Sequence, residues 1–491
     1  MTLFLKSALF ISFLIFACIL GFQESCAQSD SLAVKIDHYI QDRLNTSSLP
    51  GLAIAVVRKD SIVLVKGYGT TDGKRITADT PFAIASLSKA FTALAILQLV
   101  EKGAVDLDAP VNRYLPSFVI DDPRGTSITI RQLLHQTSGL ADTGFPELAF
   151  AEQPHTLDQA VERLKTARLV SAPGEQFHYH NPNYQVLAKV VEAVSQEEFS
   201  DYLRKHWFVP LGMSHTQNVA LTHLFYAAPD GLPRGNIFAF GKAIPIQEPQ
   251  WFVNGAAGMI STANDMAHWL QLQLNEGVIN NRPLISRQSV ALSHSLPSNP
   301  ASTYAMGWYA NDNKDLYHSG ILWTYSAEQI LLTESGYGIV LLFNGGLNPF
   351  VDYYSFIHDI AELTAHEVPP VSRWPDWVFQ ACLLGILVVG LGLSIRRIIR
   401  KRSGKHKFRH YPAWRSWFGV IGRLWPLFLL LLIPFIITAL SKRVLNWERI
   451  FLMMPDVILL LGALALSNSI LSIIQTIDFI KIRQVKKESQ N

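Results

Sequence analysis

The sequence predicts a mixed α/β (α+β) domain whose antiparallel sheet is built from both ends of the domain and flanked by helices, with a mostly helical region inserted. A three-helix transmembrane segment is expected to follow. Short β-rich runs near both ends of residues 28–373 and a helical pattern between them predict the domain. Long apolar runs after residue 374 predict the membrane segment, residues 374–491.

The first 27 residues have the features of a secretory signal peptide. Lys6 precedes an apolar run over residues 8–21, and small residues ending at Ala27 form a cleavage signal. The mature protein is therefore expected to begin near Gln28. A lipoprotein anchored through Cys18 is the alternative, which the bulky residues beside this cysteine disfavour.

The elements of the sheet follow from short runs of β-branched and aromatic residues. An opening helix is expected over Leu32–Arg43, followed by a hairpin of Leu52–Arg58 and Ser61–Gly67. Near the other end, four more strands and a closing helix are expected over Tyr304–Ala310, Leu316–Ser319, Tyr325–Leu332, Gly338–Phe343 and Tyr353–Thr364.

Cysteine usage excludes a disulfide framework for the exported domain. Two of the three cysteines lie in the predicted signal peptide, and Cys382 lies in an apolar run. The fold must therefore rest on a large core, which roughly 340 residues can bury.

Three apolar runs, at about residues 377–395, 424–440 and 451–474, are each long enough to cross a bilayer. Residues 396–415 carry nine Lys or Arg and no acid, and the tail from Lys481 adds four more. Because basic loops stay in the cytoplasm, this pattern predicts a multi-pass protein of the cell (inner) membrane. Its catalytic domain would face the periplasm or exterior, and its carboxyl terminus the cytoplasm.

The net charge of +3 hides an uneven distribution. From Trp374 onward there are 17 basic and 5 acidic residues, whereas the part before it has 25 basic and 34 acidic residues. A basic cluster beside a membrane helix is explained by topology rather than by a nucleic-acid partner. We therefore expect no nucleic-acid binding.

Ser86 and Lys89 lie one helical turn apart in an apolar segment, Pro81–Gly103. A buried lysine is held toward its neutral form, in which it can accept the serine proton. This spacing predicts a nucleophile with its own base. Ser88 lies off that face, so Ser88→Ala is expected to leave activity largely intact.

Two further segments carry polar residues suited to the same chemistry. After a Pro-Gly turn, an extended strip places Tyr179 and Asn181 on one side, where the tyrosine could pass protons to a leaving group. His318-Ser319-Gly320 ends a predicted strand, and Gly320 leaves room for a substrate backbone. The backbone N–H groups of Ile321 and Ser86 would then form an oxyanion hole.

The three motifs, in this order, resemble the serine β-lactamase and penicillin-binding-protein superfamily, in its class C β-lactamase and DD-peptidase branch. The runs Leu133–Leu140, Pro210–Met213 and Gly255–Met266 are also similar to that family. The resemblance implies Ser86 as the acylated nucleophile and Lys89 as its base. It further implies that Tyr179 protonates the leaving group, that Asn181 contacts substrate and lysine, and that His318 replaces a common lysine.

The architecture also resembles membrane-anchored peptidases that remove an N-acyl-D-amino-acid cap from nonribosomal peptides. Those enzymes are associated with recognising an asparagine side chain. The residues after Gly320 are Ile321, Leu322 and Trp323, none of which has a side-chain amide. That substrate is not carried over.

The expected function is an acyl-serine hydrolase for amides or esters, a peptidase or D-aminoacyl hydrolase, acting on a small-molecule or peptide-like substrate without metal or cofactor. A carboxylesterase, a weak β-lactamase and a non-catalytic cell-wall peptide or penicillin sensor are the alternatives. A metal site of His178, His180 and His318, or a Ser-His-Asp triad, lacks supporting spacing. The oligomeric state is left open.

Overall fold

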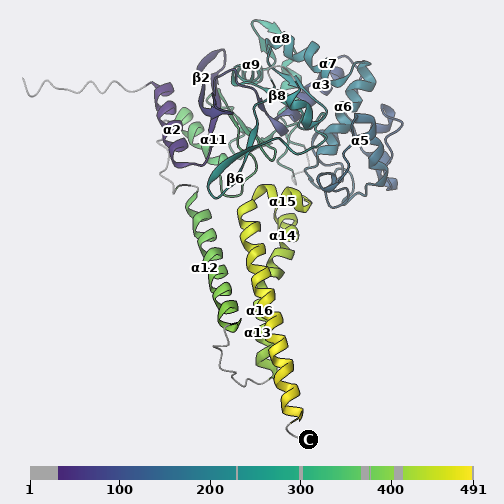
Figure 1. Ribbon diagram of the computed structural model, residues 1–491. Helices are drawn as coiled ribbons and strands as arrows, with labels where there is room; N and C mark the ends of the chain where they lie inside the picture. Colours follow the sequence, from purple (N-terminus) through teal and green to yellow (C-terminus); the bar gives the residue numbers. More distant parts are fainter. Residues whose placement is uncertain are drawn as a thin grey trace, which may run out of the picture.

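The computed structural model describes residues 31–227, 231–297, 302–366, 375, 377–402 and 413–488. The predicted signal peptide lies outside the described residues. A mixed α/β domain sits on a group of long helices formed by the carboxyl-terminal part of the chain (Figure 1).

A seven-stranded sheet forms the centre of the domain and joins its two ends. β1 (Gly51–Arg58) pairs antiparallel with both β2 (Ser61–Thr71) and the late strand β14 (Tyr337–Phe343). The order is β11-β12-β13-β14-β1-β2-β3, with β3 at Lys74–Arg75, β11 at Tyr309–Ala310, β12 at Leu316–Ile321 and β13 at Ser326–Leu332. The predicted sheet from both ends, including the first hairpin, is confirmed.

One predicted strand is wrong over most of its length. Of Tyr304–Ala310, only Tyr309–Ala310 forms a strand. Gly307 has a φ of +88°, and Tyr304 pairs back onto Tyr309 in an isolated bridge. A Cβ on Gly307 would lie 2.6 Å from the Cα of Ala90, so the chain turns tightly against a helix here instead of extending.

Helices cover both faces of the sheet, which explains why β1 is apolar along nearly its whole length. On one face, Ile54 and Val56 pack with α2 (Leu32–Thr46) and α11 (Tyr353–His366). On the other, Ala53, Ala55 and Val57 belong to the larger core, which includes α3 (Ser88–Glu101) and α9 (Ala263–Leu274).

The region inserted between β3 and β11 is mostly helical, as predicted, with three small sheets of short strands. Its other helices are η1 (Ala85–Leu87), η2 (Val111–Arg113), η3 (Pro123–Ser127), α4 (Ile130–Leu134), η4 (Glu147–Ala149), α5 (Leu157–Arg163), η5 (Leu164–Thr166), α6 (Asn181–Ser195), α7 (Phe199–Leu203), η6 (Arg204–Phe208), α8 (Val209–Leu211), η7 (Thr222–Tyr226) and α10 (Arg287–Ser293). Its strands are β4 (Phe82–Ala83), β5 (Gln217–Asn218), β6 (Gly235–Ala239), β7 (Lys242–Ile246), β8 (Met259–Ser261), β9 (Val278–Ile279) and β10 (Arg282–Pro283).

The carboxyl-terminal helices are α12 (Trp377–Arg402), α13 (Ala413–Arg423), α14 (Trp425–Ser441), α15 (Trp447–Met453) and α16 (Pro455–Glu488). Within the described residues, two segments, Trp377–Lys401 and Pro455–Lys481, are long and apolar enough to cross a membrane. The pair α13–α14, bent by 43°, makes a third if it counts as one span. The apolar run from residue 451 is broken at Met454, so the last long helix begins at Pro455.

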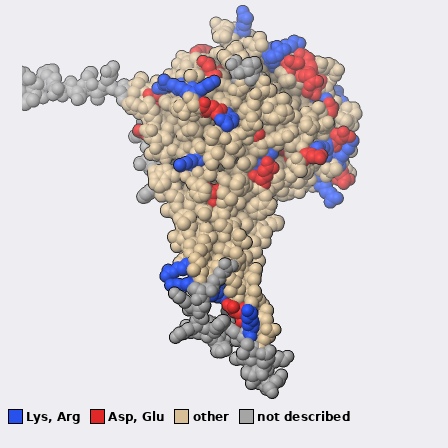
Figure 2. All heavy atoms as spheres, viewed as in Figure 1, with Lys and Arg blue, Asp and Glu red and all other residues tan. Residues whose placement is uncertain are grey.

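The carboxyl-terminal helices α12–α16 together form a helical stalk below the α/β domain (Figure 1). Figure 2 shows that the face of this helical stalk in view is almost free of Lys, Arg, Asp and Glu along most of its length. Charged side chains reappear at its far end, where Lys401 pairs with Asp478. Such an uncharged band between charged ends fits a lipid environment.

Candidate functional site

The predicted nucleophile lies in a strained turn rather than in a regular helix. Ser86 occupies the 3₁₀ turn η1, and α3 begins only at Ser88. Ala85, directly before it, has a φ of +47°, a left-handed conformation that costs an alanine roughly 1–2 kcal/mol. Lys89 still reaches the serine, because its Nζ lies 3.0 Å from Ser86 Oγ.

Ser88 holds this turn in place. Its buried hydroxyl donates to the Ala85 carbonyl at 2.6 Å and accepts from the Met259 N–H at 3.2 Å. Ser88 does lie off the Ser86–Lys89 contact. However, its bonds to the strained residue before the nucleophile give it a role that the sequence did not reveal.

Lys89 is fully buried and has three polar neighbours. Besides Ser86 Oγ, its Nζ contacts Asn181 Oδ1 at 2.9 Å and the Ala256 carbonyl at 2.8 Å. Burial, and then the charge of Arg443, hold the pKa of Lys89 well below its usual value. A neutral amine can donate to the two carbonyl-type oxygens, which leaves its lone pair for the Ser86 proton.

Tyr179 and Asn181 reach the same centre from the start of α6. The chain is extended at His180, but Asn181 already begins the helix, with Pro182 in its first turn. Tyr179 lines the same pocket as Ser86, and its ring centre is 4.9 Å from Lys89 Nζ. Burial raises the pKa of Tyr179, so its hydroxyl is protonated near neutral pH.

His318 lies against the site but does not contact the nucleophile in the described hydrogen bonds. Its Nδ1 lies 2.8 Å from the Ser319 carbonyl and must donate to it, so Nε2 accepts from the Tyr304 hydroxyl at 3.1 Å. Burial and the neighbouring Lys89 lower the pKa of His318 to about 3. The ring is therefore neutral and, unlike a lysine, offers no positive charge to a substrate.

The next two residues of β12, Ser319 and Gly320, make different contacts. Ser319 turns its hydroxyl onto Glu328 of β13, at 2.6 Å. Gly320 lies against the nucleophile turn, because a Cβ there would stand 2.3 Å from the Ile84 carbonyl. The sequence predicted that Gly320 leaves room for a substrate backbone. The structure corrects this prediction, because Gly320 closely approaches the protein's own backbone instead.

The amide of Ile321 points toward the open edge of β12. The Leu322 N–H donates to the Tyr325 carbonyl on the β13 side. Because successive N–H groups of a strand point to opposite edges, the Ile321 N–H points away from β13. β11 covers only Leu316 and Tyr317 on that edge. Among the described residues, no strand pairs with this edge beside Ile321, and Ser86 and Ile321 both line the same pocket.

Two important charged residues were missed in the sequence. Glu147 is buried and accepts from Asn181 Nδ2 at 2.7 Å and from Trp251 Nε1 at 3.1 Å. Arg443, from the loop between α14 and α15, lies 3.3 Å from Glu147 Oε1. Neither residue belongs to a local motif, and the sequence offered no signal beyond their charge.

The site opens into a cavity of about 620 Å³. Residues of the α/β domain form one part of its lining, and α14, α15 and the loop between them form another, including Ile437, Ser441, Lys442, Arg443, Leu445 and Met453. Apolar side chains such as Leu148, Trp251 and Leu347 make up much of the remaining wall.

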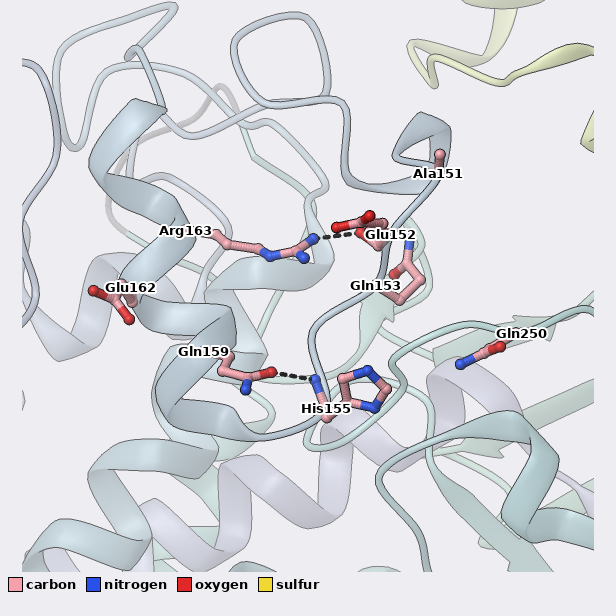
Figure 3. A pocket seen from close by; sticks show the side chains of 8 residues that line it. All are labelled: Ala151, Glu152, Gln153, His155, Gln159, Glu162, Arg163 and Gln250. Atoms are coloured by element: carbon pink, nitrogen blue, oxygen red, sulfur yellow. Dashed lines mark hydrogen bonds between the residues drawn. The ribbon is translucent and has the colours of Figure 1, made fainter.

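Figure 3 shows a separate pocket on residues 151–163 and Gln250. Arg163 there donates to the Glu152 carbonyl, and Gln159 accepts from the His155 N–H at 2.8 Å. None of the residues that line it is a serine, lysine or tyrosine, so it lacks the groups that surround Ser86.

The three histidines considered as metal ligands have separate partners. His178 lies 3.1 Å from Ser171 Oγ, His180 lies 2.9 Å from Asp142 Oδ1, and His318 bonds Tyr304. In the part of the chain that the structure describes, no group of three His, Cys, Asp or Glu side chains is placed to hold a metal ion.

Known proteins are similar to this chain in fold and in sequence. The chain is 31% identical over 315 residues to Protein flp of Staphylococcus aureus (strain MW2), covering 63% of this chain and 62% of that protein's length. The penicillin-binding protein homologue of Pyrococcus abyssi, an octamer, superposes with a TM-score of 0.58 at 22% identity, over 72% of this chain and 81% of that one. EstCE1, a hydrolase with promiscuous acyltransferase activity, gives a TM-score of 0.54 at 22% identity, over 64% and 93%.

The two structural similarities are evidence for the fold alone, since both identities are low. The family model described as Beta-lactamase matches residues 36–360, which include the turn at Ser86, the start of α6 and strand β12. The chain therefore belongs to the beta-lactamase family.

Proposed function

We propose that the protein is an extracytoplasmic, membrane-anchored serine hydrolase that cleaves an amide or ester through an acyl-enzyme on Ser86. The observation that carries this proposal is the arrangement around Lys89, whose amine contacts two carbonyl-type oxygens and Ser86 Oγ. Its other partners leave the lone pair of the neutral amine only the serine proton to accept.

In the proposed reaction, Ser86 Oγ attacks the substrate carbonyl carbon while its proton passes to Lys89 Nζ. The resulting oxyanion would be stabilised by the amides of Ser86 and Ile321. Collapse expels the leaving amine or alcohol, which takes a proton through Tyr179. Water then attacks the acyl-enzyme with the same base and releases the acid and free Ser86.

A peptidase or D-aminoacyl hydrolase is the proposed substrate class, because the free edge of β12 can pair with a peptide-like backbone. The apolar wall, including Ile437 of α14, favours substrates with an apolar group near the scissile bond. We further propose that the helical stalk lies in the cell membrane with the catalytic domain outside and the carboxyl terminus in the cytoplasm, as the basic loops predict.

The test is intact-mass spectrometry of the full chain in detergent, as wild type and Ser86→Ala. Each is exposed to a fluorophosphonate, a penicillin, and small D-aminoacyl esters and amides. A mass gain on wild type that is absent from Ser86→Ala supports the proposal, and the reagents that label and turn over identify the class. A folded wild type that no probe labels refutes it; stable adducts without turnover favour the binding protein.

A further inference from the structure

The loop between α14 and the short helix α15 contacts the catalytic domain. Lys442 ends α14 in a left-handed conformation with a φ of +58°. Asn446 Oδ1 accepts from the Arg449 N–H at 3.0 Å and so caps the start of α15. The chain reverses within these few residues, which presents Arg443 to the active site.

Three contacts fix the loop and the first turn of α15 at this position. The Val444 N–H donates to Asp142 Oδ2 at 3.1 Å. The Arg449 carbonyl accepts from Trp323 Nε1 at 3.1 Å, and Arg449 Nη2 donates to the Gln250 carbonyl at 2.7 Å. These partners come from three separate segments of the catalytic domain, so the loop cannot shift without breaking bonds to each of them.

Arg443 uses its whole guanidinium fork within this docked loop. Nη1 donates to the Tyr179 carbonyl at 3.1 Å, Nη2 lies 3.3 Å from Glu147 Oε1, and Nε lies 3.3 Å from Asp142 Oδ2. Both carboxylates are almost completely buried, with side-chain exposures of 7% for Glu147 and 0% for Asp142. Buried carboxylates need such a partner, because an uncompensated buried charge is strongly destabilising.

Glu147 transmits this contact to the catalytic amine. Its Oε1 accepts from both Arg443 and Asn181 Nδ2, and the second of these bonds orients the amide of Asn181. With Nδ2 held by Glu147, Asn181 turns Oδ1 toward Lys89 Nζ at 2.9 Å. A continuous chain of hydrogen bonds therefore runs from the membrane loop to Lys89.

We propose, on the basis of the function proposed above, that Arg443 is a positioning residue of the active site. Through Glu147 it fixes the Asn181 amide that holds Lys89, and it makes catalysis depend on the docked loop that follows α14. The catalytic centre is thus completed by a residue 264 positions after Tyr179, from outside the matched family region.

The charges around Lys89 give this role a measurable signature. Arg443 lowers the pKa of the amine and Glu147 raises it. The other titratable groups facing the amine are Tyr179, Tyr184 and His318, which burial keeps neutral near pH 7. Asp142 and His180 lie on the far side of the guanidinium and pair with each other.

Because Lys89 must be neutral to accept the Ser86 proton, labelling speeds up as pH rises through its pKa. Loss of the Arg443 charge leaves Glu147 unopposed and raises that pKa. The acidic limb of the pH–rate profile then moves to higher pH. A residue that only supported folding would leave the limb in place.

The experiment measures the rate of fluorophosphonate labelling of the full chain against pH. For Arg443→Gln we expect the shifted limb and a labelling rate at pH 7 lower by roughly tenfold or more. Arg443→Lys keeps the positive charge but loses the guanidinium group that makes several hydrogen bonds. The acidic limb of its pH–rate profile should therefore stay near that of wild type, while its maximal labelling rate falls. The double variant Arg443→Gln/Glu147→Gln removes both charges and should return the limb toward wild type.

Lys401→Gln serves as the matched control, since it removes a cation paired with Asp478 at the other end of the stalk. Its profile should equal that of wild type. If Arg443→Gln labels with the wild-type profile, the inference is wrong although the proposed function stands. If wild type itself does not label, both fail. If Arg443→Gln does not fold, the other two variants decide. The inference is overturned if the acidic limb of the pH–rate profile moves in Arg443→Lys, or if it stays displaced in the double variant.

Discussion

The two halves of the candidate active site are built in different ways. Ser86 and Lys89 lie in one short turn, three residues apart, and meet through local backbone geometry. The opposite half is assembled from Glu147, from the start of α6 at Tyr179, and from the loop holding Arg443, segments up to 296 residues apart. The Ser86–Lys89 pair is therefore encoded locally, whereas the groups around it are brought together only by tertiary structure.

The difference has an energetic consequence. The local turn needs only a few bracing contacts, such as those of Ser88 and Gly320, to hold its strained Ala85. The distant half places the charges of Glu147 and Arg443 in a buried setting, where each must be matched by a partner. Substitutions in the first half should therefore act mainly on chemistry, and those in the second on both chemistry and stability.

The largest effect is expected for the local pair itself. Lys89→Met keeps the volume of the buried side chain but removes the base, so turnover should fall by on the order of 10⁴-fold. Labelling and hydrolysis of an ester identified by the mass-spectrometric test provide the measurement. Lys189→Met removes a partly buried cation of α6 that pairs with Asp158 and Glu192 away from Ser86; it is the control and should keep full activity. Equal rates for both variants would show that Lys89 is not the base.

A smaller loss is expected on the distant side. Tyr179→Phe keeps the ring beside Lys89 but removes the hydroxyl proposed to carry the proton to the leaving group, so turnover should fall by roughly 10²–10³-fold. Single-turnover kinetics measure acylation separately from deacylation. Tyr317→Phe is the control, because Tyr317 stacks on Tyr309 but does not itself line the cavity. A Tyr179→Phe enzyme with wild-type rates would leave Lys89 alone responsible for the proton transfers.

Gly320→Ala tests the junction between the sheet and the nucleophile turn. The added Cβ meets the Ile84 carbonyl at 2.3 Å and Leu87 Cδ1 at 3.0 Å, so β12 has to move away. We expect turnover to fall by roughly 10–100-fold and the free energy of unfolding by about 1–3 kcal/mol. Thermal unfolding and ester hydrolysis measure the two effects. Gly462→Ala, with no atom within 4 Å of its Cβ, is the control, and an unchanged Gly320→Ala enzyme would contradict the predicted contact.

The same contrast explains what could be predicted from the sequence. Ser86 and Lys89 were identified because their spacing is local, and the β1–β2 hairpin because apolar runs flank a short polar turn. Tyr304–Ala310 was wrong because its aromatic pattern suits a strand, while Gly307 turns the chain against α3. Local pattern does not reveal which distant backbone a segment meets.

Glu147 and Arg443 could not be found for the same reason. Each is a single charged residue with ordinary neighbours in the sequence, and its role appears only when Asn181 and the loop after α14 are brought together. Arg443 even belonged to a short loop that had been interpreted only for membrane topology. A guanidinium that pairs with two buried carboxylates is visible only in the folded chain.

The smallest effect is expected for Ser88, which separates bracing of the turn from chemistry within it. Ser88→Ala leaves the Met259 N–H without its hydroxyl partner and removes one of the two donors to the Ala85 carbonyl, which keeps the Ser88 backbone N–H. We expect this to cost about 1–3 kcal/mol in unfolding free energy. Relaxation of the strained turn should also slow labelling of Ser86 by roughly 3–10-fold, a modest correction to the expectation that Ser88 is dispensable.

Ser138→Ala is the matched control for Ser88. Its buried hydroxyl also makes two bonds, to Asn183 Oδ1 at 2.6 Å and from the Leu140 N–H at 3.2 Å, but none to the nucleophile turn. Both variants should lose similar stability in thermal unfolding, and only Ser88→Ala should label more slowly. If the two label at the same rate, the turn keeps its strained shape without Ser88, and the nucleophile is positioned by Gly320 and α3 instead.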